Sequence, residues 1–204
     1  MTSREGILLV VSGPSGSGKG TVIGRLLERR NDFVYSVSAT TRAPRAGERD
    51  GVNYYFISRD EFEERISAGM MLEYAEYCGN YYGTPKKEVY DRLAEGKNVI
   101  LEIEVNGAMQ VREKCPDAVL LMIAPPDFAT LEARLRGRGD NVPEEVILRR
   151  LEAARYELSQ LTIYDYIVIN GNNQIDDAAD RIIAVADAER SRVEHRAVHE
   201  THAL

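Results

Sequence analysis

The sequence contains few cysteines, no long hydrophobic run and no excess of positive charge. Its two cysteines, Cys78 and Cys115, allow at most one disulfide bond in 204 residues. Because no N-terminal signal pattern is present either, we expect a protein of the reducing cytoplasm. The longest early apolar run spans residues 7–11, which is far too short to cross a bilayer, so we expect no membrane partner.

The net charge of −7 argues against non-specific binding to nucleic acid, which requires a basic surface. An anionic substrate would instead need local groups of arginine set against this acidic background. Hydrophobic residues make up 44% of the chain and charged residues 29%, as in ordinary globular proteins, and the length suits one α/β domain with insertions. We therefore expect a single cytosolic domain. We also expect small-molecule substrates and a monomer or homodimer, although composition does not decide between these two states.

A glycine-rich segment at residues 13–21 organises the rest of the chain. It follows the apolar run at residues 7–11 and precedes a helical pattern at residues 22–29, which is the strand–turn–helix context of a phosphate-binding loop. The glycines allow backbone N–H groups to turn inward around an anion, and the helix adds the partial positive charge of its N-terminus. Lys19 adds a full charge on a flexible side chain. A turn that only joined a strand to a helix would not need four glycines and a lysine at this spacing.

This loop predicts a site for a nucleoside triphosphate. Its residues are Gly13, Pro14, Ser15, Gly16, Ser17, Gly18, Lys19, Gly20 and Thr21. In the general pattern a Ser or Thr follows the lysine and its hydroxyl touches Mg²⁺, but here Gly20 holds that place. The Gly-Lys-Gly-Thr ending resembles that of nucleoside monophosphate kinases, in which water and phosphate oxygens hold most of the metal. We assign Thr21 to the phosphates or to Mg²⁺.

Two arginines in the polar stretch at residues 38–51 are candidates for binding a phosphate. Pro44 holds the preceding residue extended, so Arg42 and Arg45 flank a stiff segment. Together they can form bidentate hydrogen bonds with a doubly charged phosphate. Two solvated loop arginines would explain the same spacing equally well.

Residues 38–92 have the pattern of a small, strand-rich insertion in an α/β chain. We expect strands at residues 53–57 and 71–77, a helix opened by a capping box at residues 58–61, and a second helix capped by Thr84. Seven tyrosines lie in this region, at positions 54, 55, 74, 77, 81, 82 and 90. Their rings and hydroxyls suit stacking on a base or binding a phosphate, while a small tyrosine core would account for about half of them.

Two carboxylates end the apolar strand expected at residues 98–105. With a period of two, Glu102 and Glu104 point to the same side near the strand's carboxyl end, which borders the ligand crevice in open parallel sheets. An exposed edge strand would explain them without a function, but the surrounding Val, Ile and Leu favour a buried strand and a functional role. The last strand, at residues 166–170, places Asn170 at the same edge.

The arginine-rich segment at residues 134–141 lies between two expected helices. In a protein with a phosphate loop such a basic arm is a lid candidate, because its arginines can reach a phosphoryl group in transfer. A solvated helix end is the alternative. His195 and His199 in the C-terminal tail have the spacing of metal ligands on a helix, but a third ligand is lacking and chain ends are commonly disordered, so we expect no metal site there.

The chain resembles guanylate kinases in several ordered motifs. They are the phosphate loop and the segments at residues 38–48, 54–56, 73–83, 101–107 and 134–139, and the resemblance covers residues 6–185. It implies an α/β fold: a three-layer P-loop core with a parallel sheet, a mixed α/β insert that binds the nucleoside monophosphate (NMP), and a helical lid. The implied boundaries are 6–37, 93–126 and 160–190 for the core, 38–92 for the insert, 127–159 for the lid and 191–204 for the tail.

The same resemblance implies roles for individual residues. It places Lys19, Arg42, Arg134, Arg138 and Arg150 in catalysis, the last three as lid arginines. It assigns to the phosphate of GMP the residues Arg42, Arg45, Tyr54 and Tyr82. It assigns to guanine or its vicinity the residues Ser38, Glu73, Thr84 and Glu104. Glu102 is placed near the metal and the transferred phosphate, and Asn170 near the ATP base. Some relatives have Asp in place of Glu102 and Glu104 and Ser in place of Thr84, which keeps the chemical type but changes the side-chain length.

The resemblance implies that ATP phosphorylates GMP, and dGMP, with Mg²⁺ as cofactor. Guanylate-kinase-like modules that bind phosphopeptides are one alternative, but they tend to have a degraded phosphate loop and lid, whereas Lys19, Arg134 and Arg138 are present here. A kinase for another acceptor, such as a ribose phosphate or a different nucleotide, is the second alternative. Glu73 and Glu104 favour guanine over it, because carboxylates accept hydrogen bonds from the N1–H and amino groups of that base.

Overall fold

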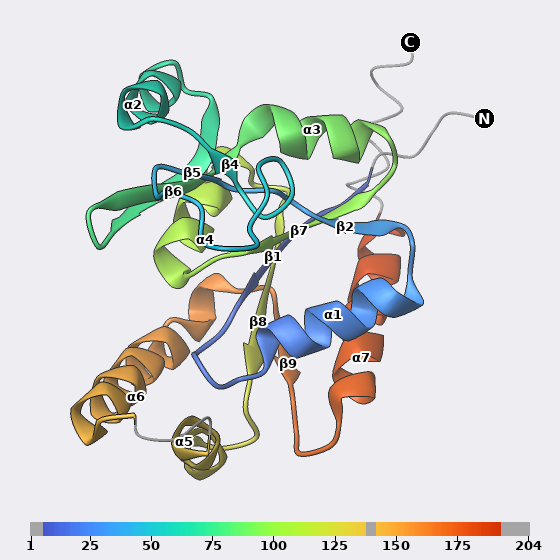
Figure 1. The fold of residues 1–204 in the computed structure, drawn as a ribbon. Coiled ribbons are helices and arrows are strands. Elements are labelled where there is room, and N and C mark those ends of the chain that lie inside the picture. Colours follow the sequence, from blue (N-terminus) through green and yellow to red (C-terminus); the bar gives the residue numbers. More distant parts are fainter. Residues whose placement is uncertain (1–5, 138–141, 193–204) are drawn as a thin grey trace.

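The computed structural model describes residues 6–137 and 142–192, which form two β-sheets with helices around them (Figure 1). A five-stranded sheet has the order β2-β7-β1-β8-β9, and a four-stranded sheet has the order β4-β3-β6-β5. The strands are β1 (Leu8–Ser12), β2 (Phe33–Tyr35), β3 (Ala39–Thr40), β4 (Tyr55–Phe56), β5 (Met71–Tyr77), β6 (Asn80–Pro85), β7 (Asn98–Glu102), β8 (Val119–Ala124) and β9 (Tyr166–Ile169). The helices are α1 (Lys19–Arg29), α2 (Arg59–Ser67), α3 (Lys86–Ala94), α4 (Val105–Lys114), α5 (Phe128–Arg136), α6 (Glu144–Ser159), η1 (Leu161–Ile163) and α7 (Ile175–Glu189).

The five-stranded sheet is parallel throughout and is the middle of three layers. Every residue of β1 and β8 is buried, so both faces of these strands need a helical cover. On one face Leu9 packs with residues of α1 and α7 such as Ile182, and on the other Val10 packs with residues of α3 and α4 such as Val111. The predicted three-layer α/β fold with a parallel sheet is confirmed.

The four-stranded sheet is mixed and has a small core of its own. β3 pairs in parallel with β4 and antiparallel with β6, which also pairs antiparallel with β5. Phe62 of α2 is fully buried under this sheet and stacks on Tyr81 with ring centroids 5.1 Å apart. Tyr55 and Tyr74 pack against the same cluster, so part of the tyrosine set does form a local core. The side chain of Gln110 in α4 bonds to both the N–H and the C=O of Tyr74, at 3.2 and 2.9 Å, and thereby ties the outer strand β5 to the core.

Helices α5 and α6 pack on each other through a separate apolar cluster that includes Leu131, Leu135, Ile147 and Leu151. Arg136 reinforces this pair, because its guanidinium binds Glu132 of α5 and Glu144 of α6. In Figure 1 the α5–α6 pair and the four-stranded sheet lie on opposite sides of the loop that joins β1 to α1. None of the helices in the described residues is long and apolar enough to span a membrane.

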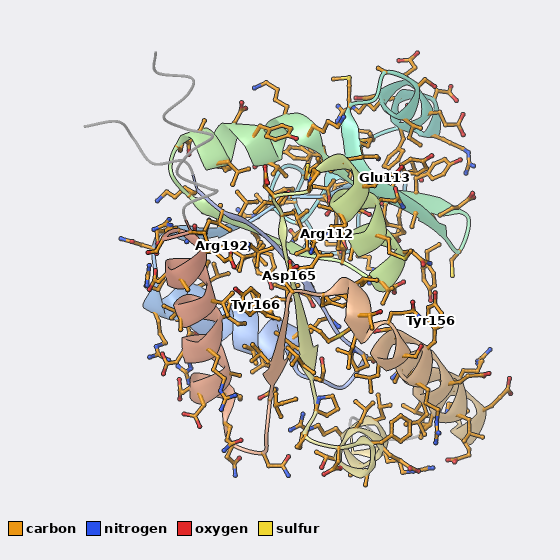
Figure 2. All side chains as sticks on the ribbon, turned by 180° about the vertical axis from the view of Figure 1, so that it is seen from behind. Arg112, Glu113, Tyr156, Asp165, Tyr166 and Arg192 are labelled. Carbon is orange, nitrogen blue, oxygen red and sulfur yellow. The ribbon has the colours of Figure 1, made fainter. Side chains whose placement is uncertain are left out.

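A polar group fastens α4 to the β8–β9 side of the sheet. Arg112 of α4 binds Asp165 at 2.5 Å, and the same carboxylate accepts a hydrogen bond from the backbone N–H of Leu120 at 2.8 Å. Figure 2, a view from behind, shows Arg112 and Asp165 near the middle of the molecule, with Tyr166 next to Asp165. The hydroxyl of Tyr166 in turn bonds Glu189, a carboxylate that is 1% exposed. These hydrogen bonds connect α4 and α7 to the β8–β9 side of the five-stranded sheet. They stabilise the elements that carry the candidate site.

The strand expected at residues 98–105 is shorter than predicted. It ends at Glu102, Glu104 is the N-cap of α4, and α4 is a helix that the sequence pattern did not reveal. The two carboxylates thus do not share one strand face, although both are exposed at the carboxyl edge of the sheet. The apolar residues Val105 and Ala108 continued the strand's own hydrophobic run, which hid the change of period.

Thr84 does not cap a helix, as the sequence suggested. β6 continues through it to Pro85, which is itself the N-cap of α3, and Thr84 pairs with Glu73 of β5. Burial and cross-strand pairing outweigh the local preference of Thr for a cap position. Strand β2 is short and ends at Tyr35. The histidines of the C-terminal tail lie outside the described residues.

Candidate functional site

The loop between β1 and α1 has a backbone that only glycine can adopt at several positions. Gly13, Gly16 and Gly18 have positive φ angles of 150°, 92° and 86°. A Cβ atom at Gly13 would lie 2.1 Å from the carbonyl oxygen of Ile123, and one at Gly18 would lie 2.4 Å from Nδ2 of Asn170. Gly18 is the N-cap of α1 and brings no capping side chain. The first N–H groups of α1 are therefore left to an anion, which is the arrangement that a phosphate-binding loop requires.

Lys19 is the first residue of α1, and its ammonium group donates a hydrogen bond to the carbonyl of Gly13. A carboxylate from another element lies in its surroundings. Burial raises the pKa of Glu157 in α6, the charge of Lys19 opposes this rise, and the charge of Glu104 adds to it. Helix α6 therefore brings an acidic group toward the phosphate loop, beside two of the predicted site residues.

Asn170 directly follows β9 and fixes the shape of the phosphate loop. Its side chain is 4% exposed, and its Nδ2 donates a hydrogen bond to the carbonyl of Ser17 at 2.8 Å. Arg134 of α5 donates to the carbonyl of Asn170 at 2.9 Å and to Oδ1 of Asn172 at 3.0 Å. Arg134 thus belongs to a helix and is held by the β9–α7 loop, instead of standing in an irregular arm. Arg150 is exposed on α6, and Arg138 lies outside the described residues.

Arg42 is held in a fixed orientation by acidic and aromatic neighbours. Glu48 accepts hydrogen bonds from its guanidinium at 2.9 and 3.0 Å and from the N–H of Arg45 at 2.7 Å. The guanidinium also lies over the ring of Tyr54, 5.6 Å from the centroid. Hydrogen bonding to Glu48, and less strongly to Tyr82, raises the pKa of Arg42, while Arg42 lowers the pKa of Glu48. The loop therefore presents one oriented cation beside two tyrosines, with Arg45 exposed next to it.

Glu73 is a buried carboxylate on the inner side of the four-stranded sheet. It is 5% exposed, and its Oε1 accepts a hydrogen bond from the hydroxyl of Thr84 at 2.7 Å. Burial raises the pKa of Glu73, whereas Thr84 and the charge of Lys114 oppose the rise. A Cβ atom at Gly107 of α4 would lie 3.0 Å from Oε2 of Glu73, so the small residue makes room for the carboxylate. A buried acceptor of this kind favours a ligand that brings hydrogen-bond donors.

A cavity of about 290 Å³ opens where the carboxyl end of β7 meets the four-stranded sheet. Ser38, Tyr54, Thr84 and Glu102, which are far apart in the sequence, line it together. Glu102 is also the neighbour of Val11 in the β1–β7 pair, two residues before Gly13, so the cavity lies beside the start of the phosphate loop. Its full lining is Tyr35, Ser36, Val37, Ser38, Val52, Asn53, Tyr54, Thr84, Leu101, Glu102 and Ile103.

Comparison with known proteins agrees with this arrangement. Residues 5–189 match the family model "Guanylate kinase". The chain belongs to the guanylate kinase family. It is 53% identical to a guanylate kinase of Lactococcus lactis, with 94% of this chain and 92% of that protein covered, and 53% identical to one of Streptococcus thermophilus, with 94% and 91% covered. The crystal structure of guanylate kinase from Anaplasma phagocytophilum superposes with a TM-score of 0.71 at 36% identity, over 93% of this chain and 89% of that one.

The family, the fold and the enzyme class expected from the sequence are thus confirmed: this guanylate kinase is a phosphotransferase. Three residues near its site were missed by sequence reasoning. Glu48 follows Arg45 by three residues, and this spacing of opposite charges in a turn could have indicated that Glu48 binds the arginine segment. Tyr35 and Glu157 carried no signal, because their proximity to Glu102 and Lys19 depends on how strands and helices pack.

Proposed function

We propose that this guanylate kinase transfers the γ-phosphoryl group of ATP to GMP, giving ADP and GDP, between the phosphate loop and the cavity beside it. The observation that carries the proposal is the position of Glu102, which lines the cavity and pairs with Val11 just before the phosphate loop. A donor phosphate on the loop and an acceptor in the cavity would then lie next to each other. Such proximity is the main requirement of phosphoryl transfer.

On the donor side, we assign the ATP phosphates to the loop at residues 13–21 and to Lys19. The glycine conformations and the uncapped start of α1 support this assignment. A second hollow, of about 530 Å³, is lined by Asp127, Thr130, Arg134 and Asn172 among others. It adjoins Asn170 through the hydrogen bond from Arg134 to the carbonyl of that residue, and we assign it to the base of ATP.

The residues beside the loop fit a hard divalent cation. Thr21 is exposed on the first turn of α1 and Glu102 is exposed at the end of β7, so a hydroxyl and a carboxylate oxygen are available. Oxygen ligands are those that Mg²⁺ prefers, and with few protein ligands it keeps several waters. When bound, Mg²⁺ neutralises charge on the phosphates. Thr21 and Glu102 would hold it, directly or through water.

On the acceptor side, we assign the phosphate of GMP to Arg42, Arg45, Tyr54 and Tyr82. Arg42 is already oriented by Glu48 and Tyr54, so little conformational freedom remains to be lost on binding. Arg45 is exposed at the same turn and adds a second cation. Guanidinium groups match the geometry of a phosphate through paired N–H donors.

Guanine is assigned to Glu73, Glu104, Ser38 and Thr84. The N1–H and amino groups of guanine are donors, and a buried carboxylate such as Glu73 is their natural acceptor. Adenine presents an unprotonated N1 at the same edge, and it would leave the carboxylate unpaired at a cost of at least about 1–3 kcal/mol. Because none of these assignments involves the ribose 2′-hydroxyl, we expect dGMP to be accepted as well.

Arg134, Arg138 and Arg150 are proposed as lid arginines of the segment at residues 127–159, which would close over the phosphates together with the insert at residues 38–92. Arg134 donates a hydrogen bond to the carbonyl of Asn170, the residue whose side chain contacts the phosphate loop. Arginines that reach the transferring group stabilise its charge, and closure excludes water so that ATP is not hydrolysed instead.

A coupled assay with ATP and a panel of acceptors tests this function. We expect turnover with GMP and a preference over AMP, CMP and UMP on the order of 10⁴-fold. Equal turnover with another nucleotide or with a ribose phosphate would contradict the assignment of guanine.

Lys19→Ala should reduce turnover to near the detection limit while the protein stays folded, since it removes the mobile cation of the loop. Lys87→Ala is a matched control, because Lys87 is an exposed lysine of α3 paired with Asp91. Near-normal turnover of the Lys19→Ala variant would show that the loop does not act as proposed.

A further inference from the structure

Tyr35 is the last residue of β2 and one of the walls of the cavity. Its hydroxyl donates a hydrogen bond to Oε2 of Glu102 at 3.2 Å. Tyr35 is 38% exposed, so the apolar core does not require a tyrosine at this position. The hydroxyl, in contrast, is directed at a carboxylate that we place beside the metal and the transferred phosphate.

The sheet explains how the two side chains meet. β2 and β7 are parallel neighbours with Tyr35 opposite Ile100, and Ile100 and Glu102 are two positions apart on β7. Because side chains alternate along a strand, Tyr35 and Glu102 lie on the same face of the sheet. The long tyrosine side chain then reaches along β7 to its carboxyl end. The contact is therefore set by the strand register.

The direction of the hydrogen bond is also determined. A tyrosine hydroxyl has an ordinary pKa of about 10, and an ionised carboxylate has no proton to donate. The phenol therefore stays protonated and remains a donor to the carboxylate at neutral pH. In the part of the chain that the structure describes, no other side chain or backbone group donates a hydrogen bond to Glu102.

We propose that Tyr35 is a positioning residue for the phosphoryl-transfer reaction: its hydroxyl fixes the rotamer of Glu102, so that this carboxylate is held at the junction of the phosphate loop and the acceptor cavity. Glutamate has one more rotatable bond than aspartate, and an exposed glutamate without a partner would sample several rotamers. Tyr35 removes this freedom before the substrates bind. The inference rests on the function proposed above and names a further residue on which it depends.

Tyr35→Phe tests the inference, because it removes the hydroxyl and keeps the ring. We expect kcat to fall by about tenfold, the effect of losing one hydrogen bond to a charged group, while KM for GMP changes by less than about twofold. The melting temperature should stay unchanged, since the ring is partly exposed. Tyr55→Phe is the matched control: it removes a comparable hydrogen bond, from Tyr55 to Glu88 at 3.0 Å, outside the proposed site, and kcat should stay at the wild-type value.

A double-mutant cycle shows whether Tyr35 acts through Glu102. In the Glu102→Ala background, adding Tyr35→Phe should change kcat by less than about twofold. A full tenfold further loss in that background would overturn the proposal, as would a Tyr35→Phe variant with wild-type kcat or one that changes only KM for GMP. A wild-type protein that does not phosphorylate GMP would instead overturn the proposed function, and the inference with it.

Discussion

Glu48 and Glu73 are two carboxylates of the proposed acceptor side, and the protein holds them in different ways. Glu48 is half-buried at a turn and binds Arg42 together with the N–H of Arg45. Glu73 is almost fully buried and has Thr84 as its donor. Glu48 orients a neighbouring cation, whereas we propose that Glu73 accepts hydrogen bonds from a ligand. Substitution should therefore affect binding in both cases but stability in only one.

Glu48→Gln should raise KM for GMP about fivefold with a smaller change in kcat, because Arg42 loses a charged bidentate partner and with it a fixed orientation. Steady-state kinetics with GMP as the varied substrate measures this. Glu63→Gln serves as the control, since Glu63 also pairs with an arginine, Arg59, at 3.0 Å on an exposed helix. A lower KM for Glu48→Gln would mean that Glu48 competes with the phosphate for Arg42.

Glu73→Gln should weaken GMP binding but stabilise the free protein, by on the order of 1 kcal/mol at pH 7.5. The glutamine keeps an oxygen for the hydroxyl of Thr84 and removes a buried charge. The unfolding temperature of Glu73→Gln is measured and compared with that of the wild type. Glu76→Gln, at an exposed position of the same strand β5, is the control. An unfolding temperature of Glu73→Gln below that of the wild type would contradict the burial argument.

The pH dependence of this effect has a definite sign. Burial raises the pKa of Glu73 above its ordinary value of 4.5, so the charged form destabilises the folded protein at pH values above the folded pKa. This destabilisation disappears as the pH falls through the folded pKa toward 4.5. The advantage of Glu73→Gln should therefore be present at pH 7.5 and shrink as the pH falls toward 4.5. KM for GMP of the wild type should rise over the same range, because a protonated Glu73 cannot accept both guanine donors.

At the scale of elements, the phosphate loop depends on a distant part of the chain as well as on its local motif. Asn170, which follows β9, packs against the loop at Gly18. Gly18→Ala should abolish measurable turnover and destabilise the protein, since its φ is 86° and the new Cβ would lie 2.4 Å from Nδ2 of Asn170. We expect a loss of about 1–3 kcal/mol in unfolding free energy, the usual cost of a strained backbone position.

Gly24→Ala is the matched control, because Gly24 lies in the interior of α1. Beyond the neighbouring residues and the helix's own backbone, no heavy atom lies within 4 Å of the Cβ that it would add, and alanine favours a helix interior over glycine by about 1 kcal/mol. This variant should therefore unfold at a higher denaturant concentration than the wild type and keep its activity. If both alanine variants behaved alike, the loop conformation would not be the cause of the Gly18 effect.

At the scale of the whole molecule, Asn98 joins three distant parts of the chain. It is fully buried, its Oδ1 accepts from the N–H of Ile7 at 3.1 Å and from Arg190 at 2.9 Å, and its Nδ2 donates to Asp32 at 3.3 Å. Arg190 also pairs with Asp32 at 3.4 Å. The start of β1, the segment after α1 and the end of α7 are thus held at the first residue of β7, at the opposite end of this strand from Glu102 and the cavity.

Asn98→Ala should lower the unfolding free energy by about 2–4 kcal/mol, because a buried N–H and a partly buried guanidinium lose their acceptor. A urea titration measures the loss, and kcat of the folded variant should equal that of the wild type. Asn31→Ala, at an exposed asparagine nearby in the sequence, should cost little. A change in kcat for Asn98→Ala would mean that this network influences the site.

Local sequence was sufficient for several elements and for the glycine-rich loop between β1 and α1. The phosphate loop was predictable because glycine spacing, a preceding apolar strand and Lys19 all lie within fifteen residues. The start of α2 was predictable for the same reason: Ser58 accepts a hydrogen bond from the N–H of Glu61 at 3.1 Å, as its capping box indicates. The family followed from the order of several such motifs, since each motif is short and keeps its own residues together.

The sequence by itself therefore determined the buried strands, the phosphate loop and the membership in the guanylate kinase family. Only the tertiary structure decided that Thr84 is a strand residue bonded to Glu73, that Tyr35 reaches Glu102, and that Asn170 supports a loop 153 residues earlier in the chain. The physical reason is that periodicity and capping act between near neighbours. Strand register and burial, in contrast, bring together side chains whose separation along the chain carries no signal.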